Sequence, residues 1–265
     1  MQVFYGRNKQ YVDFAERVLR DCGKIVVDWR GKDITGGRYL NEIVTELVNK
    51  KIEEALSREL PTHRLFTKGS FDMGDDGYEW ICDPLDGAFL YSKGLTNVVI
   101  SMTLVHRGEP MVAAIYHPFL DEMYIAVQGC GVRKNQKLIS RSVQKLEKFS
   151  AINVEWWPAA AYNVASVVHA LSVEYELYPI HIGSVVYSAC LVAEGVLAAS
   201  LFGGRLVGKN HEAAAVMLIM QEAGGCYTDL QGKPIGFTGV IEGFIISSQE
   251  SFQAVLAGVK YSINE

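Results

Sequence analysis

The most informative stretch of the chain runs from residue 79 to residue 87 and reads EWICDPLDG. Its apolar start predicts a strand, and the proline after Asp83 interrupts ladder pairing because it has no N–H to donate. Asp86 and Gly87 predict a tight turn. Two carboxylates three residues apart at a strand end can converge on one hard cation such as Mg²⁺, while the amides of Gly87 and Ala88 can meet a phosphate. The alternative is that the Asp-Pro and Asp-Gly pairs only form turns.

Apolar residues on both sides of this stretch alternate between helical and strand spacing. In the first half they predict helices over 11–27 and 41–60 and strands over 78–82, 98–106, 111–116 and 122–128. In the second half they predict helices over 159–171, 185–194, 212–222 and 249–259 and strands over 175–182, 196–201, 226–229 and 243–247. We therefore expect an α/β (α+β) protein of layered alternating helices and sheets. Its two parts, 1–150 with the DPLDG motif and 151–265 with the EAAA…EAGG motif, should pack as one unit.

The composition excludes several classes of function. The 265 residues include 25 basic and 30 acidic side chains, so the net charge is −5 and no basic excess serves nucleic acid or a membrane surface. No apolar run approaches the roughly 18 residues of a membrane span, and residues 1–8 lack the order of a signal peptide. Five widely spaced cysteines with apolar neighbours indicate reduced, buried thiols. We expect a cytoplasmic protein.

Four motifs, in this order, give the chain a resemblance to the inositol monophosphatase superfamily of Mg²⁺-dependent phosphomonoesterases. They are WIxDPLDG over 80–87, AIYHPxxDExYxAxxGxG over 114–131, GS at 183–184 followed by LVAEG over 191–195, and EAAA ending in QEAGG over 212–225. The resemblance implies a layered α/β fold, commonly a homodimer, in which acidic side chains hold two or three Mg²⁺ ions against a substrate phosphate. One ion activates the attacking water, so the protein's work is positioning and charge neutralisation.

The resemblance also implies where the metal ligands lie. Asp83 and Asp86 stand where the family has its two central aspartate ligands, and Glu212 stands where it has a third aspartate. Glu212 keeps the carboxylate but carries it one methylene further out. His211 replaces the tryptophan that precedes this ligand, and it either fills the packing role of the tryptophan or faces the site.

Four further positions depart from the family pattern. Lys68 stands where the family has a metal-binding glutamate that orients the water, and Ala88 replaces a hydroxyl residue that helps to position this water. Asn49 replaces an aspartate that assists the same step. Arg205 lies near the position of an acidic residue that contacts substrate hydroxyls in inositol-specific members.

These substitutions change the charge of the expected pocket. Asp83, Asp86 and Glu212 contribute −3 and Lys68 and Arg205 contribute +2, so the five positions carry −1. An inositol-specific member would carry a negative charge at all five. Two Mg²⁺ ions bring four positive charges, and an ammonium within about 4–6 Å of the aspartates competes for their charge. We therefore expect one Mg²⁺ ion at most, with the usual two-metal mechanism weakened or lost.

Three outcomes stay open for this pocket. One Mg²⁺ ion on Asp83, Asp86 and Glu212 could work with Lys68 as the second positive charge. Lys68 could instead pair with an aspartate and leave a metal-free pocket that binds an anion or serves a partner. Lys68 or His211 could also act as an acid or base in different chemistry.

The candidate site thus consists of two sets of residues. The catalytic set is Lys68, Asp83, Asp86 and Glu212, and the set expected to meet substrate or phosphate is Gly87, Ala88, Ser184, Arg205 and His211. Ser184 is equally expected to be the N-cap of a helix, with no contact to the substrate. The expected ligand is a small phosphorylated molecule, namely an inositol, sugar or nucleotide phosphate, and no nucleic-acid or membrane partner is expected.

Overall fold

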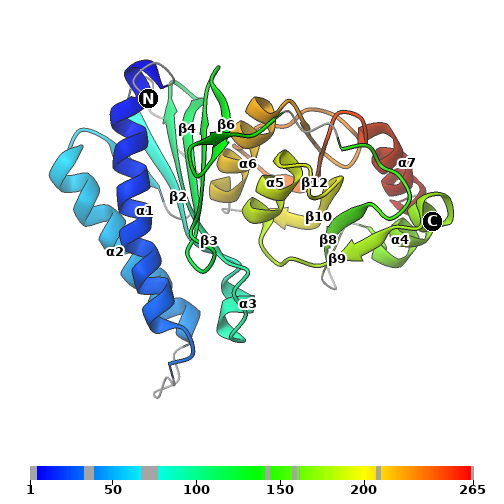
Figure 1. Cartoon of the computed structure of the whole chain (residues 1–265), viewed down its shortest axis with the longest axis horizontal. Helices are drawn as coiled ribbons and strands as arrows, with labels where there is room; N and C mark the ends of the chain where they lie inside the picture. Colours follow the sequence, from blue (N-terminus) through cyan, green and yellow to red (C-terminus); the bar gives the residue numbers. More distant parts are fainter. Residues whose placement is uncertain are drawn as a thin grey trace.

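The computed structural model describes residues 5–32, 39–66, 77–140, 144–156, 160, 162–206 and 210–263, and Figure 1 shows their arrangement. Lys68 lies outside these residues, as do residues 33–38 between the first two helices. The backbone of Arg205 is described, but its side chain is not.

The first sheet has seven strands that lie side by side in chain order. They are β1 (Arg64–Phe66), β2 (Tyr78–Asp86), β3 (Val99–His106), β4 (Glu109–His117), β5 (Glu122–Val127), β6 (Gly131–Lys134) and β7 (Lys137–Leu138). β1 runs parallel to β2, and the later neighbours pair antiparallel. Antiparallel neighbours need only short connections, which the closely spaced turns of this part of the sequence supply.

Two long helices, α1 (Lys9–Trp29) and α2 (Leu40–Glu59), cover one face of this sheet (Figure 1). The short 3-10 helix η1 (Gly6–Asn8) leads into α1. The face of α1 toward the sheet is apolar at helical spacing, and its largest buried side chains are Tyr11, Phe14, Val18, Leu19 and Val26. Burial of such a stripe is what holds a helix against a sheet.

The second sheet has the order β11-β12-β10-β8-β9. Its strands are β8 (Ala151–Glu155), β9 (Tyr178–Ile180), β10 (Ala199–Leu206), β11 (Cys226–Thr228) and β12 (Ile241–Ser247). β8 pairs in parallel with both neighbours, whereas β12 pairs antiparallel with β10 and β11. Two helices that pack against each other, α4 (Val164–Tyr175) and α7 (Phe252–Ile263), share a core with this sheet (Figure 1).

Between the two sheets lie α5 (Val185–Ala193) and α6 (Asn210–Ala223) (Figure 1). The largest apolar cluster joins both sheets through these two helices. α6 carries Ala213, Ala214 and Ala215, all fully buried, so its backbone approaches the first sheet closely. The order helices, sheet, helices, sheet, helices confirms the predicted layered α/β fold, and this middle layer positions the site.

The structure differs from the predicted elements in several places. The strands β1, β6, β7 and β8 and the 3-10 helix η1 were not predicted, and β9 is shorter than the strand predicted over 175–182. β2 continues past Cys82 to Asp86, with a shift of register around its proline. The short helix α3 (Ala88–Ser92) follows it directly and was not expected. α4 begins at Val164 instead of residue 159 because Asn163 caps it by accepting two backbone N–H groups.

No helix in the described part of the chain has the length and apolar character needed to cross a bilayer. The division of the chain at residue 150 stays a prediction.

Candidate functional site

A β-bulge brings the two aspartates of β2 onto one face. Asp83 pairs with Ser101 of β3 and Asp86 pairs with Val99, so two residues of β2 oppose the single residue Ile100. Side chains three positions apart in a regular strand point to opposite faces. The extra residue of the bulge cancels that alternation. Both carboxylates therefore face the helices between the sheets.

Gly87 turns the chain sharply out of β2. Its φ is +92°, and a Cβ at this position would lie 2.3 Å from the backbone oxygen of Asn97. Glycine is the residue that adopts this backbone angle without strain and leaves room for the neighbouring carbonyl. Ala88 then begins α3 and is half-buried.

Asp83 faces the first turn of α6. Its Oδ1 atom accepts the N–H of Leu85 at 3.0 Å, and its Oδ2 atom lies 3.5 Å from Nε2 of His211. His211 is buried and the adjacent Glu212 is half-buried. One ligand atom from each of Asp83, His211 and Glu212 lies within 4.8 Å of the other two. We call these three residues the α6 cluster, the candidate for holding a metal ion among the described residues.

Asp86 faces the first turn of α5 instead. Ser184, the N-cap of α5, donates its hydroxyl to Oδ2 of Asp86 at 2.6 Å, and the N–H of Val186 donates to the same oxygen at 2.7 Å. Burial is the main reason that the pKa of Asp86 is raised to about 7, and the negative charge of Asp83 adds to it. The two hydrogen bonds oppose that rise. One oxygen of Asp86 is thus committed to holding the start of α5.

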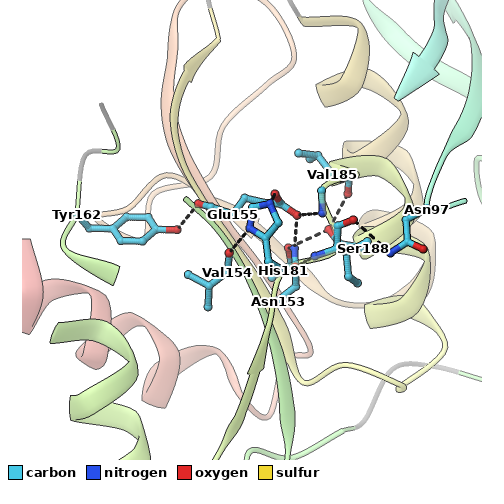
Figure 2. Close-up of polar contacts among 11 residues, drawn as sticks. Asn97, Asn153, Val154, Glu155, Tyr162, His181, Val185 and Ser188 are labelled. Carbon is cyan, nitrogen blue, oxygen red and sulfur yellow. Dashed lines mark hydrogen bonds and ion pairs between the residues drawn. The ribbon is translucent and has the colours of Figure 1, made fainter. Parts of the chain in front are cut away.

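A second buried carboxylate, Glu155 at the end of β8, holds the turn before α5 from the other side (Figure 2). Its Oε1 atom accepts the N–H of Gly183 at 2.7 Å and the side-chain amide of Asn153 at 3.1 Å. Its Oε2 atom lies 3.3 Å from Nε2 of His181. Asn153 in turn accepts the N–H of Ile182 at 2.8 Å. The turn is therefore pinned by side chains of the second sheet.

Further polar contacts tie this turn to its surroundings (Figure 2). The amide of Asn153 also donates to Ser200 of β10 at 2.9 Å, and Ser200 lies 2.8 Å from the hydroxyl of Ser188 on α5. On the first-sheet side, Asn97 donates to the carbonyl of Ile182 at 3.4 Å. Side chains from both sides of the molecule thus hold the turn at residues 182–184 in place. Ser184 of this turn donates the hydrogen bond that orients Asp86.

The structure brings some of the predicted site residues together and leaves others apart or undescribed. Asp83, Glu212 and His211 converge, and Asp86 and Gly87 lie at the same strand end.

Ser184 is fully buried and caps α5, so a contact with substrate stays a prediction for it. The carboxamide oxygen of Asn49 on α2 is buried without a hydrogen-bond partner among the described residues. The predicted roles of Lys68 and Arg205 fall on side chains that the structure does not describe.

Sequence reasoning missed Glu155 and Asn153. A signal was nevertheless present, because β8 reads AINVE and ends its apolar run on an acidic residue, as WICD does at residues 80–83. An acidic residue at the end of a buried strand must meet donors or a cation. Here it meets the backbone of the α5 turn.

The carboxylates and the histidine that converge at this strand end are ligand types that divalent metal ions accept. The chain belongs to the inositol monophosphatase family, whose sequence model matches residues 9–264. The divergence of the metal site from the family pattern stays a prediction.

Individual relatives agree with the family assignment. A protein of Aquifex aeolicus named fructose-1,6-bisphosphatase/inositol-1-monophosphatase is 28% identical over 250 residues, which cover 89% of this chain and 91% of that protein. A Xylella fastidiosa protein named Nus factor SuhB is 30% identical over 192 residues, 71% of this chain and 68% of that protein. The fold resembles that of an IMPase from Thermotoga maritima, with a TM-score of 0.80, 24% identity and coverage of 95% and 97% of the two chains.

The donor atoms of the α6 cluster fit a divalent ion. Two carboxylates and one imidazole are ligands that protein-bound divalent ions accept. The three ligand atoms are also close enough to share one ion. The cluster therefore passes the chemical test for one such ion.

Proposed function

We propose that the protein binds a small phosphate ester at the end of β2, with conventional two-metal hydrolysis weakened or lost. The observation that carries this proposal is the different engagement of the two aspartates. Asp86 uses one oxygen to hold α5, and the metal-ligand group found among the described residues has three members, Asp83, His211 and Glu212. That supply of ligands suits one ion better than two.

The substrate class follows from the family and the pocket chemistry. The Aquifex relative is named for two phosphate esters, one of a sugar and one of inositol. We therefore propose an inositol, sugar or nucleotide phosphate as ligand. The sharp turn at Gly87 leaves backbone N–H groups of the following residues at the strand end, where they can face a phosphate.

The residues of the site would divide the work. Asp83 and Glu212 hold a divalent ion, which when bound neutralises phosphate charge and lowers the pKa of a coordinated water. Gly87 and Ala88 orient the phosphate through their backbone. Asp86 keeps the start of α5 in place, because one of its oxygens accepts from the Ser184 hydroxyl and the Val186 N–H.

The convergence of the α6 cluster favours a second candidate function. In it the protein is an active phosphatase that uses one Mg²⁺ ion on Asp83, Asp86 and Glu212, and Lys68 supplies the second positive charge. A lysine can neutralise phosphate as a point charge. The proposed homodimer and cytoplasmic location accompany either function.

One experiment separates the two functions. Thermal unfolding is followed with inositol, sugar and nucleotide phosphates, with and without Mg²⁺, and phosphate release is measured on the same panel. A ligand that binds the folded state raises its stability by RT ln(1 + [L]/Kd). Stabilisation without turnover supports the binding protein, and turnover lost in Asp83→Asn supports the one-ion phosphatase. Neither stabilisation nor turnover with any ester would contradict both.

The substitutions from the family pattern allow a converse test. Lys68→Glu combined with Ala88→Thr should raise phosphate release if these two positions limit hydrolysis. Unchanged turnover in the folded double variant would show that the obstacle lies elsewhere.

A further inference from the structure

His211 presents a nitrogen to the candidate metal site. It lies in the first turn of α6 with 7% of its surface exposed, and its Nε2 atom is 3.5 Å from Oδ2 of Asp83. Glu212 follows on the same helix and completes a set of ligand atoms that all lie within 4.8 Å of one another. The cluster thus combines one imidazole with two carboxylates.

The separation between His211 and Asp83 suits a shared ion better than a direct hydrogen bond. N–H···O hydrogen bonds are usually about 2.7–3.2 Å long, and the observed 3.5 Å exceeds that range. Two ligand atoms that each lie about 2.1 Å from a tetrahedral ion are about 3.4 Å apart. The observed separation is close to that value.

The surroundings of the cluster are polar on the side of Glu212 as well. The hydroxyl of Tyr227 on β11 is buried and has no hydrogen-bond partner among the described residues. Burial raises the pKa of the Tyr227 hydroxyl, and the negative charge of Glu212 raises it further.

We infer that His211 is a third metal ligand and that the α6 cluster takes an ion of the Mn²⁺, Co²⁺ or Zn²⁺ class in preference to Mg²⁺. Imidazole nitrogen suits these transition metals, whereas Mg²⁺ prefers oxygen ligands and retains its waters. The inference takes one element from the proposed function, namely that a divalent ion binds between Asp83 and Glu212.

The test measures metal affinity directly. Protein stripped of metal with EDTA is titrated with Co²⁺, followed by its visible absorption, and with Zn²⁺ and Mg²⁺ by calorimetry, in the absence of any phosphate ester. Zn²⁺ outcompetes Mg²⁺ at many sites, so the decisive comparison is between the wild type and His211→Gln. We expect His211→Gln to weaken Co²⁺ and Zn²⁺ by about tenfold or more while changing Mg²⁺ affinity little.

A matched variant controls for histidines elsewhere. His169→Gln alters an exposed histidine on α4 and should leave all three affinities and the Co²⁺ spectrum unchanged. The inference is overturned if His211→Gln keeps the wild-type Co²⁺ spectrum and affinity, or if it weakens Mg²⁺ as much as Zn²⁺.

A second measurement needs no variant, in case the buried position does not tolerate glutamine. A crystal structure of the wild type soaked with Zn²⁺ should show Nε2 of His211 about 2.1 Å from the ion. An ion bound by Asp83 and Glu212 with the imidazole turned away would contradict the inference. Failure of every phosphate ester to bind would remove the proposed function and leave this metal preference standing.

Discussion

The two aspartates of the DPLDG stretch are near neighbours in the chain, yet the structure gives them contrasting surroundings. Asp86 is enclosed by the start of α5, where Ser184 and Val186 both donate to one of its oxygens. Its burial raises its pKa to about 7. Asp83 faces His211 across a distance that suits a shared ion. A single sequence motif therefore serves two purposes at the end of one strand.

This difference teaches how a buried acidic pair is made tolerable. A carboxylate away from water needs donors or a cation. Asp86 finds donors in the first turn of α5, while Asp83 accepts the N–H of Leu85 and faces the imidazole of His211. The enclosed region around Asp86 should lose stability when its backbone geometry or hydrogen bonds change. The region around Asp83, which is equally buried, should lose metal affinity when its ligands change.

The largest effect should come from Gly87→Ala in the enclosed region. The substitution combines a positive φ with a Cβ only 2.3 Å from the backbone of Asn97, and we expect a loss of about 5 kcal/mol in the free energy of unfolding. Gly94→Ala is the matched control, since Gly94 also has a positive φ but nothing within 4 Å of its Cβ. Denaturant titration of the two variants should separate them, and equal losses would refute the clash.

The next effect concerns the buried charge of Asp86. Its pKa in the folded protein is raised to about 7 from 3.8, so the folded state binds the proton more tightly than the unfolded state does. Stability of the metal-free protein must then fall as pH rises through the window between these two values. Asp86→Asn should remove this fall and stabilise the metal-free protein by about 4 kcal/mol at pH 8.

The measurement is thermal unfolding in EDTA at several pH values. A wild-type profile as flat as that of Asp86→Asn between pH 4 and about 8 would contradict the raised pKa. Glu250→Gln, which removes an exposed carboxylate, serves as the control and should follow the wild type.

A metal titration compares the two aspartates directly. Asp83→Asn should weaken divalent-ion binding about 100-fold, or about 2.7 kcal/mol, because it removes a ligand of the α6 cluster. Asp86→Asn should weaken it less, since the amide oxygen of asparagine can still accept from Ser184 and Val186 and keep α5 in place. Calorimetry of both variants provides the comparison, and a larger loss in Asp86→Asn would reverse our assignment of the two roles.

The smallest effect should come from Glu155→Gln. Glutamine keeps one acceptor for the turn at Gly183 but loses the second oxygen that faces His181, so we expect a loss of about 1 kcal/mol. The negative charge of Glu155 is one cause of the raised pKa of Asp86. Its removal should therefore move the pH-dependent fall in stability to lower pH, whereas a purely steric role would leave that midpoint in place.

The fold was largely predictable from the sequence because its elements have strong local patterns. The spacing of apolar residues located α1, α2 and the meander from β3 to β5. The bulge in β2 was not predictable, because it is defined by pairing with β3 and not by any local pattern. α3 was missed because five residues are too few for a helical period to appear.

The candidate site was predictable only in part. Asp83, Glu212 and His211 could be named from motifs, and the structure brings them together. The hydrogen bond that commits Asp86 to Ser184 joins residues 98 positions apart, which no local pattern encodes. The contribution of Lys68 to the pocket charge stays a prediction, as it falls outside the described residues.

The most direct test of the account is the number of divalent ions bound per chain. Metal-free protein is dialysed to equilibrium against excess Mn²⁺ and then Mg²⁺, with and without a phosphate ester, and the bound metal is measured by elemental analysis. We predict one ion per chain under each condition in which metal binds, and its loss in Asp83→Asn. Two ions per chain, both dependent on Asp83, would contradict the account and restore conventional two-metal catalysis.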